Sequence, residues 1–304
     1  MKPTHPLHGL IAATHTPFHA DGSLNLAAVE KQAAHLLKKG VRIVFIGGST
    51  GESSSLSLDE RRALAQRWSE VARGTALRVV VHVGSNCLGD ARLLAAQAAQ
   101  LGATAISALA PSYYKPRTLD TLIACLAEIA AAAPETPFYF YDIPALTGVS
   151  FSMPEFLEKA PARIPNLAGI KFTNPDLMAY LQCLRAGELD VPWGIDEWML
   201  GALATGARGA VGSSFNFAAP LYQRLIAAFE RGNLAAARDA QHRSTQLIAL
   251  LARHGYMGAA KALMKLLGVD VGPPRLPNVR LTPEQVTGLV RGLEDIGFFG
   301  WLQP

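Results

Sequence analysis

The chain alternates between short apolar runs and longer segments with helical periodicity, and this alternation continues over its first 230 residues. The apolar runs are mostly continuous, as expected for parallel strands that are covered on both faces. Eight such strand-then-helix units close naturally into a (β/α)8 barrel, the TIM barrel. A doubly wound open sheet is the alternative, although no GxGxxG motif follows the first strand. The expected strands are Gly9–Thr16, Val41–Gly47, Arg78–Gly84, Ala103–Ala110, Pro137–Ile143, Leu167–Thr173, Val191–Ile195 and Ala207–Gly212.

After about residue 230 the strand-like runs stop and only helical segments follow. Thr282 begins a capping box, a pattern that marks the first turn of a helix. The predicted helices are Asn233–His254, Tyr256–Leu267 and Pro283–Ile296. We therefore expect a catalytic barrel domain over residues 1–230 and a three-helix C-terminal extension over residues 231–304.

Composition and charge argue against several classes of protein. Half of the 304 residues are hydrophobic and only 17% are charged, which favours a large packed core over disorder. The net charge is only +4 and the basic residues are scattered, so we expect no nucleic-acid partner. No apolar stretch is long enough to span a bilayer, and the N-terminus has no signal-peptide pattern. Cys87, Cys125 and Cys183 lack CxxC spacing, so a soluble cytoplasmic protein without disulfides is expected.

Lys171 ends the apolar run 167–173, where a charged side chain has no obvious place. Alternation in a strand puts Gly169, Lys171 and Thr173 on one face, with Ile170 and Phe172 on the other. A charge buried there must be paired, neutralised or used, and a neutral lysine is a nucleophile for carbonyl groups. The alternative is a lysine that extends from the strand end to solvent.

In a barrel of this kind the active site lies at the C-terminal ends of the strands. The second strand is followed by Gly47-Gly48-Ser49-Thr50-Gly51-Glu52, in which small residues and two hydroxyls suit an anion such as a carboxylate. An ordinary tight turn before a helix is the alternative. The turn is not a P-loop, because no Gly-Lys-Ser/Thr follows it.

Tyr141 ends the fifth strand and shares a face with Tyr139 and Ile143. A tyrosine at a barrel mouth can relay protons, although a core tyrosine with a satisfied hydroxyl is the commoner case. Neighbouring strands lie about 4.8 Å apart, so Tyr141 and Lys171 can meet if the fifth and sixth strands are adjacent.

Other polar residues also follow predicted strands. Asp196 and Glu197 end the seventh strand, where two carboxylates suit sugar hydroxyls, a metal, or simply a helix N-terminus. The eighth strand ends in Gly212-Ser213-Ser214, and Tyr113 lies in the loop after the fourth.

Taken together, these motifs resemble those of the class I aldolase family of N-acetylneuraminate lyase and dihydrodipicolinate synthase. The resemblance covers nearly the whole barrel. The matching pieces are Gly48-Ser49-Thr50-Gly51-Glu52, Tyr141-Asp142-Ile143-Pro144-Ala145-Leu146-Thr147-Gly148, Gly169-Ile170-Lys171-Phe172-Thr173 and Gly212-Ser213-Ser214-Phe215-Asn216.

Within this family the chain looks like the lyase branch, which cleaves N-acetylneuraminate to N-acetylmannosamine and pyruvate. The synthases carry an arginine where this chain has Leu146. Departures bear on which sugar is bound: Asp142 stands where many relatives have Asn, Phe215 where many have Tyr, and Trp198 follows the acidic pair.

The resemblance implies a role for each matching residue. Lys171 would form a Schiff base with the keto carbon, and Tyr141 would take the proton from the hydroxyl of the departing aldehyde carbon. Ser49 and Thr50 would bind the carboxylate, and Tyr113, from a neighbouring subunit of a homotetramer, would complete a relay with Ser49 and Tyr141. The implied sugar-site residues are Thr173, Gly194, Asp196, Glu197 and Ser213.

The resemblance implies a 2-keto acid or sugar acid as substrate, with no cofactor and no metal. Four alternatives remain open. The acceptor can differ, as in 4-hydroxy-tetrahydrodipicolinate synthase, which Leu146 argues against, or in a 2-keto-3-deoxysugar aldolase or a related hydro-lyase. A sensor that binds a keto acid without turnover is the non-enzymatic alternative.

Overall fold

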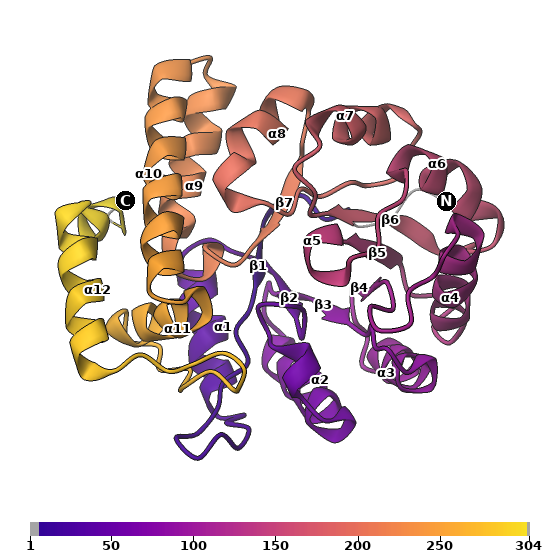
Figure 1. Ribbon diagram of the computed structural model, residues 1–304, viewed down its shortest axis with the longest axis horizontal. Helices are drawn as coiled ribbons and strands as arrows, with labels where there is room; N and C mark the ends of the chain where they lie inside the picture. The colour runs from indigo at the N-terminus through magenta and orange to yellow at the C-terminus, as the bar shows by residue number, and fades with distance from the viewer. Residues whose placement is uncertain (1–5, 303–304) are drawn as a thin grey trace.

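The computed structural model describes residues 6–302, in which parallel strands curl into a barrel surrounded by helices (Figure 1). The strands pair in the order β6-β5-β4-β3-β2-β1-β7, and every pairing is parallel. The strands are β1 Gly9–Ala13, β2 Ile43–Ile46, β3 Arg78–His82, β4 Ala105–Leu109, β5 Phe138–Asp142, β6 Leu167–Phe172 and β7 Gly209–Gly212.

The segment from Asp190 to Trp193 closes the barrel between β6 and β7. It makes isolated parallel bridges from Phe172 to Trp193 and from Trp193 to Ala210, so the strand expected over Val191–Ile195 is present only as single bridges. Its backbone accepts hydrogen bonds from Ile170 and Phe172 and exchanges two with β7. This closure confirms the (β/α)8 barrel and rules out the open-sheet alternative.

Helices cover the outside of the barrel, and their ends follow the signals in the sequence. Ser57 and Glu60 form the capping box of α2, while Gly40 and Gly74 take positive φ just after α1 and α2. The barrel helices are α1 Ala28–Lys38, α2 Leu58–Ala72, α3 Leu88–Gln100, α4 Leu119–Ala131, α5 Pro144–Thr147, α6 Met153–Lys159, α7 Leu177–Arg185, α8 Met199–Thr205 and α9 Phe215–Glu230. Short 3-10 turns are η1 Ser53–Ser55, η2 Ala160–Ala162, η3 Asp196–Trp198 and η4 Phe298–Leu302.

The C-terminal extension consists of α10 Leu234–Arg253, α11 Tyr256–Leu266 and α12 Pro283–Asp295, followed by η4. In Figure 1 these helices, orange to yellow, lie along one side of the barrel, with α10 and α11 both packing on α9. The helices match those predicted from the sequence to within one residue at each end. No helix within residues 6–302 is long and apolar enough to cross a membrane.

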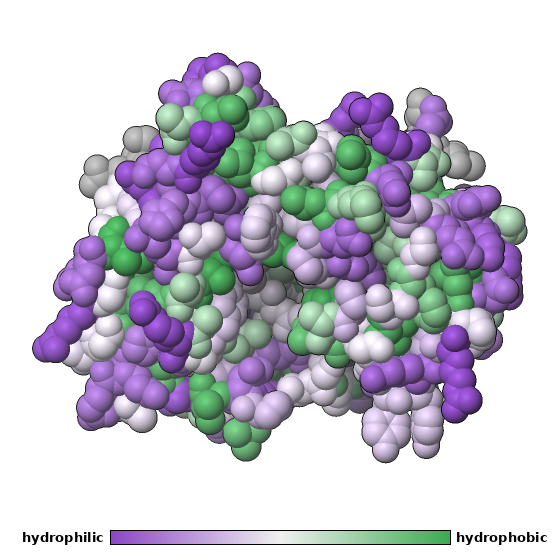
Figure 2. All heavy atoms as spheres, turned by 45° about the horizontal axis from the view of Figure 1, so that its top comes forward, coloured by the Kyte–Doolittle hydropathy of each residue, from purple (hydrophilic) through white to green (hydrophobic). Residues whose placement is uncertain are grey.

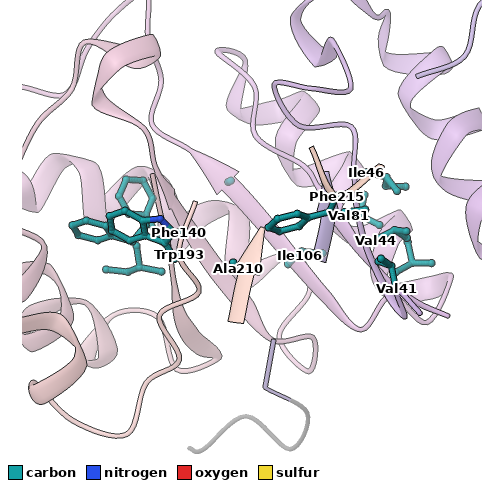
Figure 3. Packing of buried hydrophobic residues seen from close by; sticks show 14 of the residues in the cluster. Val41, Val44, Ile46, Val81, Ile106, Phe140, Trp193, Ala210 and Phe215 are labelled. Carbon is teal, nitrogen blue, oxygen red and sulfur yellow. The ribbon is translucent and has the colours of Figure 1, made fainter. Parts of the chain in front are cut away.

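Two apolar clusters lie on the two faces of the sheet. The larger joins the outer face to the helices and includes Val44, Phe140, Trp193 and Phe215 (Figure 3). The smaller fills the barrel interior, where Phe45, Tyr139 and Tyr141 are found. Alternation along β5 therefore points Tyr141 inward, as predicted. The surface shown in Figure 2 mixes hydrophilic and hydrophobic side chains and is hollowed near its middle.

Candidate active site

Lys171 is buried at the end of β6 without a charged partner. Lys171 is only 4% exposed, so its side chain does not extend to solvent. Its Nζ lies 3.6 Å from the centre of the Tyr141 ring and 4.3 Å from that of Phe45. In the described part of the chain no carboxylate forms an ion pair with it. Aromatic faces stabilise a buried cation weakly, so the arrangement favours use of the amine over storage of a charge.

Tyr141 lies directly beside Lys171, because the register of β5 and β6 pairs the two residues. The ring is buried and meets Phe45 and His82 edge-on, at centroid distances of 5.8 and 5.9 Å. These contacts fix the ring and leave its hydroxyl 3.4 Å from the hydroxyl of Ser49. The predicted contact between Tyr141 and Lys171 is thus present, and the Tyr141 hydroxyl is within hydrogen-bond distance of the turn after β2.

The turn after β2 is compact and held at both ends. Thr16 Oγ1 donates to the carbonyl of Gly51 over 2.6 Å, and His82 Nδ1 donates to that of Gly47 over 3.0 Å. A Cβ on Gly51 would lie 2.9 Å from the backbone nitrogen of Gly47, so the fold of the turn needs glycine there. Among residues 6–302, nothing accepts a hydrogen bond from the backbone N–H groups of Ser49 and Thr50. These donors remain free for an anion.

Asp196 begins η3 and is 6% exposed, beside the end of β7. Its Oδ2 accepts hydrogen bonds from the backbone N–H of Ser214, over 2.8 Å, and from the Ser214 hydroxyl. Burial raises the pKa of this carboxyl to about 6, an effect that the Ser214 bonds oppose. The carboxyl packs so tightly on β7 that a Cβ on Gly212 would lie 2.3 Å from Oδ1.

The other predicted sugar-site residues lie around the same mouth. Glu197 and Ser213 are partly exposed, and the Ser213 hydroxyl is 2.6 Å from that of Tyr256 in the extension. A Cβ on Gly194 would lie 1.9 Å from Thr173 Oγ1, so only glycine fits against that hydroxyl. Thr173 Oγ1 is buried and has no hydrogen-bond partner among the described residues. Such an unsatisfied hydroxyl is available to a ligand.

Within a single chain, Tyr113 does not lie beside Ser49 or Tyr141. Its side chain is 80% exposed, its ring lies against that of Tyr114, and its backbone N–H donates to Asn86 Oδ1 over 3.1 Å. The predicted contact with Ser49 and Tyr141 therefore requires a second copy of the chain.

His82 is a buried residue of the site that the sequence analysis did not single out. It ends β3, packs against Tyr141 and holds the turn through Gly47. Burial, together with the charges of Arg61 and Lys171, lowers its pKa well below the ordinary range, so it is neutral. Its signal in the sequence was the same as that of Lys171, an ionisable residue inside an apolar run.

The family model for the dihydrodipicolinate synthetase family matches residues 6–296. The chain belongs to that family. N-acetylneuraminate lyase A of Xenopus laevis is 44% identical over 275 residues, which cover 89% of this chain and 90% of the relative. Among solved structures, N-acetylneuraminate lyases from Proteus mirabilis and Aliivibrio salmonicida are 39% and 40% identical, each with a TM-score of 0.94. Both alignments cover 97% of this chain, with 100% and 98% of the respective neighbours. These relatives are carbon–carbon lyases, and the resemblance inferred from the motifs is confirmed.

Proposed function

We propose that this member of the dihydrodipicolinate synthetase family is a class I aldolase that cleaves N-acetylneuraminate to N-acetylmannosamine and pyruvate. The observation that carries the proposal is the buried, unpaired Lys171 stacked on Tyr141, whose hydroxyl faces Ser49. The similarity to N-acetylneuraminate lyases along nearly the whole chain supports the same substrate.

In the proposed reaction the neutral amine of Lys171 attacks the keto carbon, and loss of water gives a protonated imine. Tyr141 takes the proton from the hydroxyl on the carbon two bonds away from the imine carbon, and passes its own hydroxyl proton to Ser49. The bond between this hydroxyl-bearing carbon and the carbon next to the imine breaks, its electrons pass to the imine nitrogen, and the aldehyde leaves. Protonation of the enamine and hydrolysis then release pyruvate and restore Lys171.

Ser49 and Thr50 would hold the carboxylate next to the keto carbon, because their backbone N–H groups and hydroxyls lie in the turn beside Tyr141. Thr173, Gly194, Asp196, Glu197 and Ser213 would line the site of the departing sugar. Buried acceptors such as Asp196 discriminate strongly, because a substrate without the matching hydroxyl leaves them unpaired. Leu146, 66% exposed on α5, offers no cation for the second carboxylate of a synthase substrate.

Two measurements test the reaction. Borohydride reduction in the presence of pyruvate should add the reduced pyruvyl group to Lys171, located by peptide mass mapping; a chain that gains no mass there has a different mechanism. Pyruvate release should then be fastest with N-acetylneuraminate in a panel that includes 2-keto-3-deoxy sugar acids. Faster condensation of pyruvate with aspartate semialdehyde would instead assign the chain to the synthases.

Tyr113 would complete the relay from a neighbouring subunit of a homotetramer, which its exposure in the single chain supports. The Tyr113→Phe and Lys171→Ala variants should each be nearly inactive. When co-assembled, they should recover activity in sites that combine Lys171 of one copy with Tyr113 of another. Failure of a mixed oligomer to recover activity would place Tyr113 outside the relay.

A further inference from the structure

A buried ion pair joins the C-terminal extension to the turn that carries Ser49. Lys261, in α11, is 2% exposed, and its Nζ lies 2.6 Å from Oε1 of Glu52. The same ammonium donates to the backbone carbonyls of Thr16, over 2.8 Å, and Pro273, over 3.1 Å. The ammonium thus has one carboxylate and two carbonyl oxygens within 3.1 Å, so its charge is paired.

Glu52 needs such a partner because its carboxylate is buried, at 5% exposure, and its backbone is also unfavourable. It ends the turn with φ at +53°, the only positive value for a non-glycine residue among residues 6–302. Its second oxygen, Oε2, accepts the backbone N–H of Arg275 over 2.8 Å, and its own N–H donates to the carbonyl of Ser49 over 3.0 Å. Contacts from the extension therefore fix Glu52, whose backbone N–H is hydrogen-bonded to the carbonyl of Ser49.

The extension also holds the segment that follows the turn. The Arg275 guanidinium donates to the carbonyls of Gly22 and Ser55 and pairs with Glu60 at the start of α2. On the other side, Thr16 joins the two networks, because its hydroxyl bonds Gly51 while its carbonyl accepts from Lys261. The turn is therefore anchored by β1 and by the extension at the same point.

We propose that Lys261 and Glu52 are positioning residues for substrate binding, and that the C-terminal extension holds the carboxylate-binding turn in its working geometry. This inference rests on the proposed function of Ser49 and Thr50. Neither Lys261 nor Glu52 contacts Lys171 or Tyr141 in the described structure, so the pair acts through the turn. Loss of the cation leaves a buried carboxylate unpaired next to Ser49, and the turn has to shift or take in water.

The test is Lys261→Met, which keeps the length of the side chain and removes its charge. We expect the KM for N-acetylneuraminate to rise about tenfold while kcat changes far less, because ground-state binding of the carboxylate is lost. The half-saturating pyruvate concentration in borohydride trapping of Lys171 should rise in parallel. Lys265→Met is the matched control, since Lys265 lies one turn along α11 and pairs with Asp270 at an exposed site.

A KM equal to that of the control, with only a lower unfolding temperature, would overturn the inference by making the pair purely structural. A fall in kcat at unchanged KM would overturn it as well. If Lys261→Met does not fold, Glu52→Gln carries the same expectation, because it keeps the oxygen that accepts from Arg275. The double variant should recover part of the KM, since no buried charge is left unpaired. Absence of trapping in the parent chain would refute the proposed function itself, which distinguishes the two failures.

Discussion

Lys171 and Lys261 are both buried lysines, but the groups that surround them differ in kind. At the seam between barrel and extension, Lys261 meets a carboxylate and two carbonyls. At the barrel mouth, Lys171 meets only the faces of two aromatic rings. Burial is nearly equal, at 2% and 4% exposure, so burial alone does not mark a reactive lysine. What distinguishes Lys171 is that it forms no hydrogen bond and no ion pair with the described residues, whereas Lys261 forms an ion pair and two hydrogen bonds.

Replacing each lysine by methionine is the most direct test of this comparison. Lys171→Met should abolish pyruvate release, a loss of at least about 10⁴-fold, because no imine forms. It should also raise the free energy of unfolding by about 1 kcal/mol, since a buried amine without a hydrogen-bond partner is removed. Lys261→Met should instead lower it by about 3 kcal/mol. Urea unfolding of both variants measures the two changes in the free energy of unfolding. Changes of the same sign would contradict the distinction drawn between Lys171 and Lys261.

Tyr141→Phe should have the next largest effect. It keeps the ring that stacks on Lys171 and removes only the hydroxyl, so kcat should fall about 10³-fold while borohydride trapping continues. Tyr139→Phe is the control, because Tyr139 lies on the same strand and face but donates its hydroxyl to Asp190 over 2.9 Å. Normal turnover by Tyr141→Phe would remove that hydroxyl from the mechanism.

Asp196 extends the comparison to a buried carboxylate with two donors. Its pKa of about 6 means that it gains a proton, and loses acceptor capacity, as the pH falls below that value. The KM for N-acetylneuraminate should therefore rise about tenfold between pH 7 and pH 5. In Asp196→Asn the KM should already be high at pH 7 and vary little with pH. A parent profile that is flat from pH 7 to pH 5 would contradict this role.

Asp142 should affect stability and not catalysis. Burial raises its pKa from 3.8 to about 7, and its partner is Asn174, whose Nδ2 lies 3.4 Å from Oδ2. The folded state binds the proton more tightly than the unfolded state, so this carboxyl lowers stability as the pH rises from 3.8 to about 7. Asp142→Asn should stabilise the protein by about 2 kcal/mol at pH 8 and by much less at pH 4. Thermal unfolding at the two pH values checks the sign.

The sequence was sufficient for those features that depend on local pattern. The apolar run around Lys171 and the alternation along β5 predicted both inward-facing residues, which the structure places side by side. The sequence predicts a regular strand over Val191–Ile195, but its composition does not reveal that the neighbouring strands pair with this segment only at single positions. Roles of the individual site residues stay predictions.

Contacts of the barrel with the C-terminal extension and with another subunit could not be predicted from local pattern. Lys261 looks like an ordinary helical lysine, and nothing in its surroundings along the chain indicates that Glu52 lies beside it. Tyr113 was predicted only through the family resemblance, because a residue that acts across an interface leaves no periodic signal.

The tie between Glu52 and the extension bears on the order in which the protein matures during synthesis. A nascent chain that has emerged as far as residue 230 contains every strand and every residue proposed for chemistry. It still lacks Lys261 and Arg275, the two residues of the extension that contact Glu52. On this basis we expect tight substrate binding to appear only after α11 and the segment that carries Arg275 have docked on the barrel.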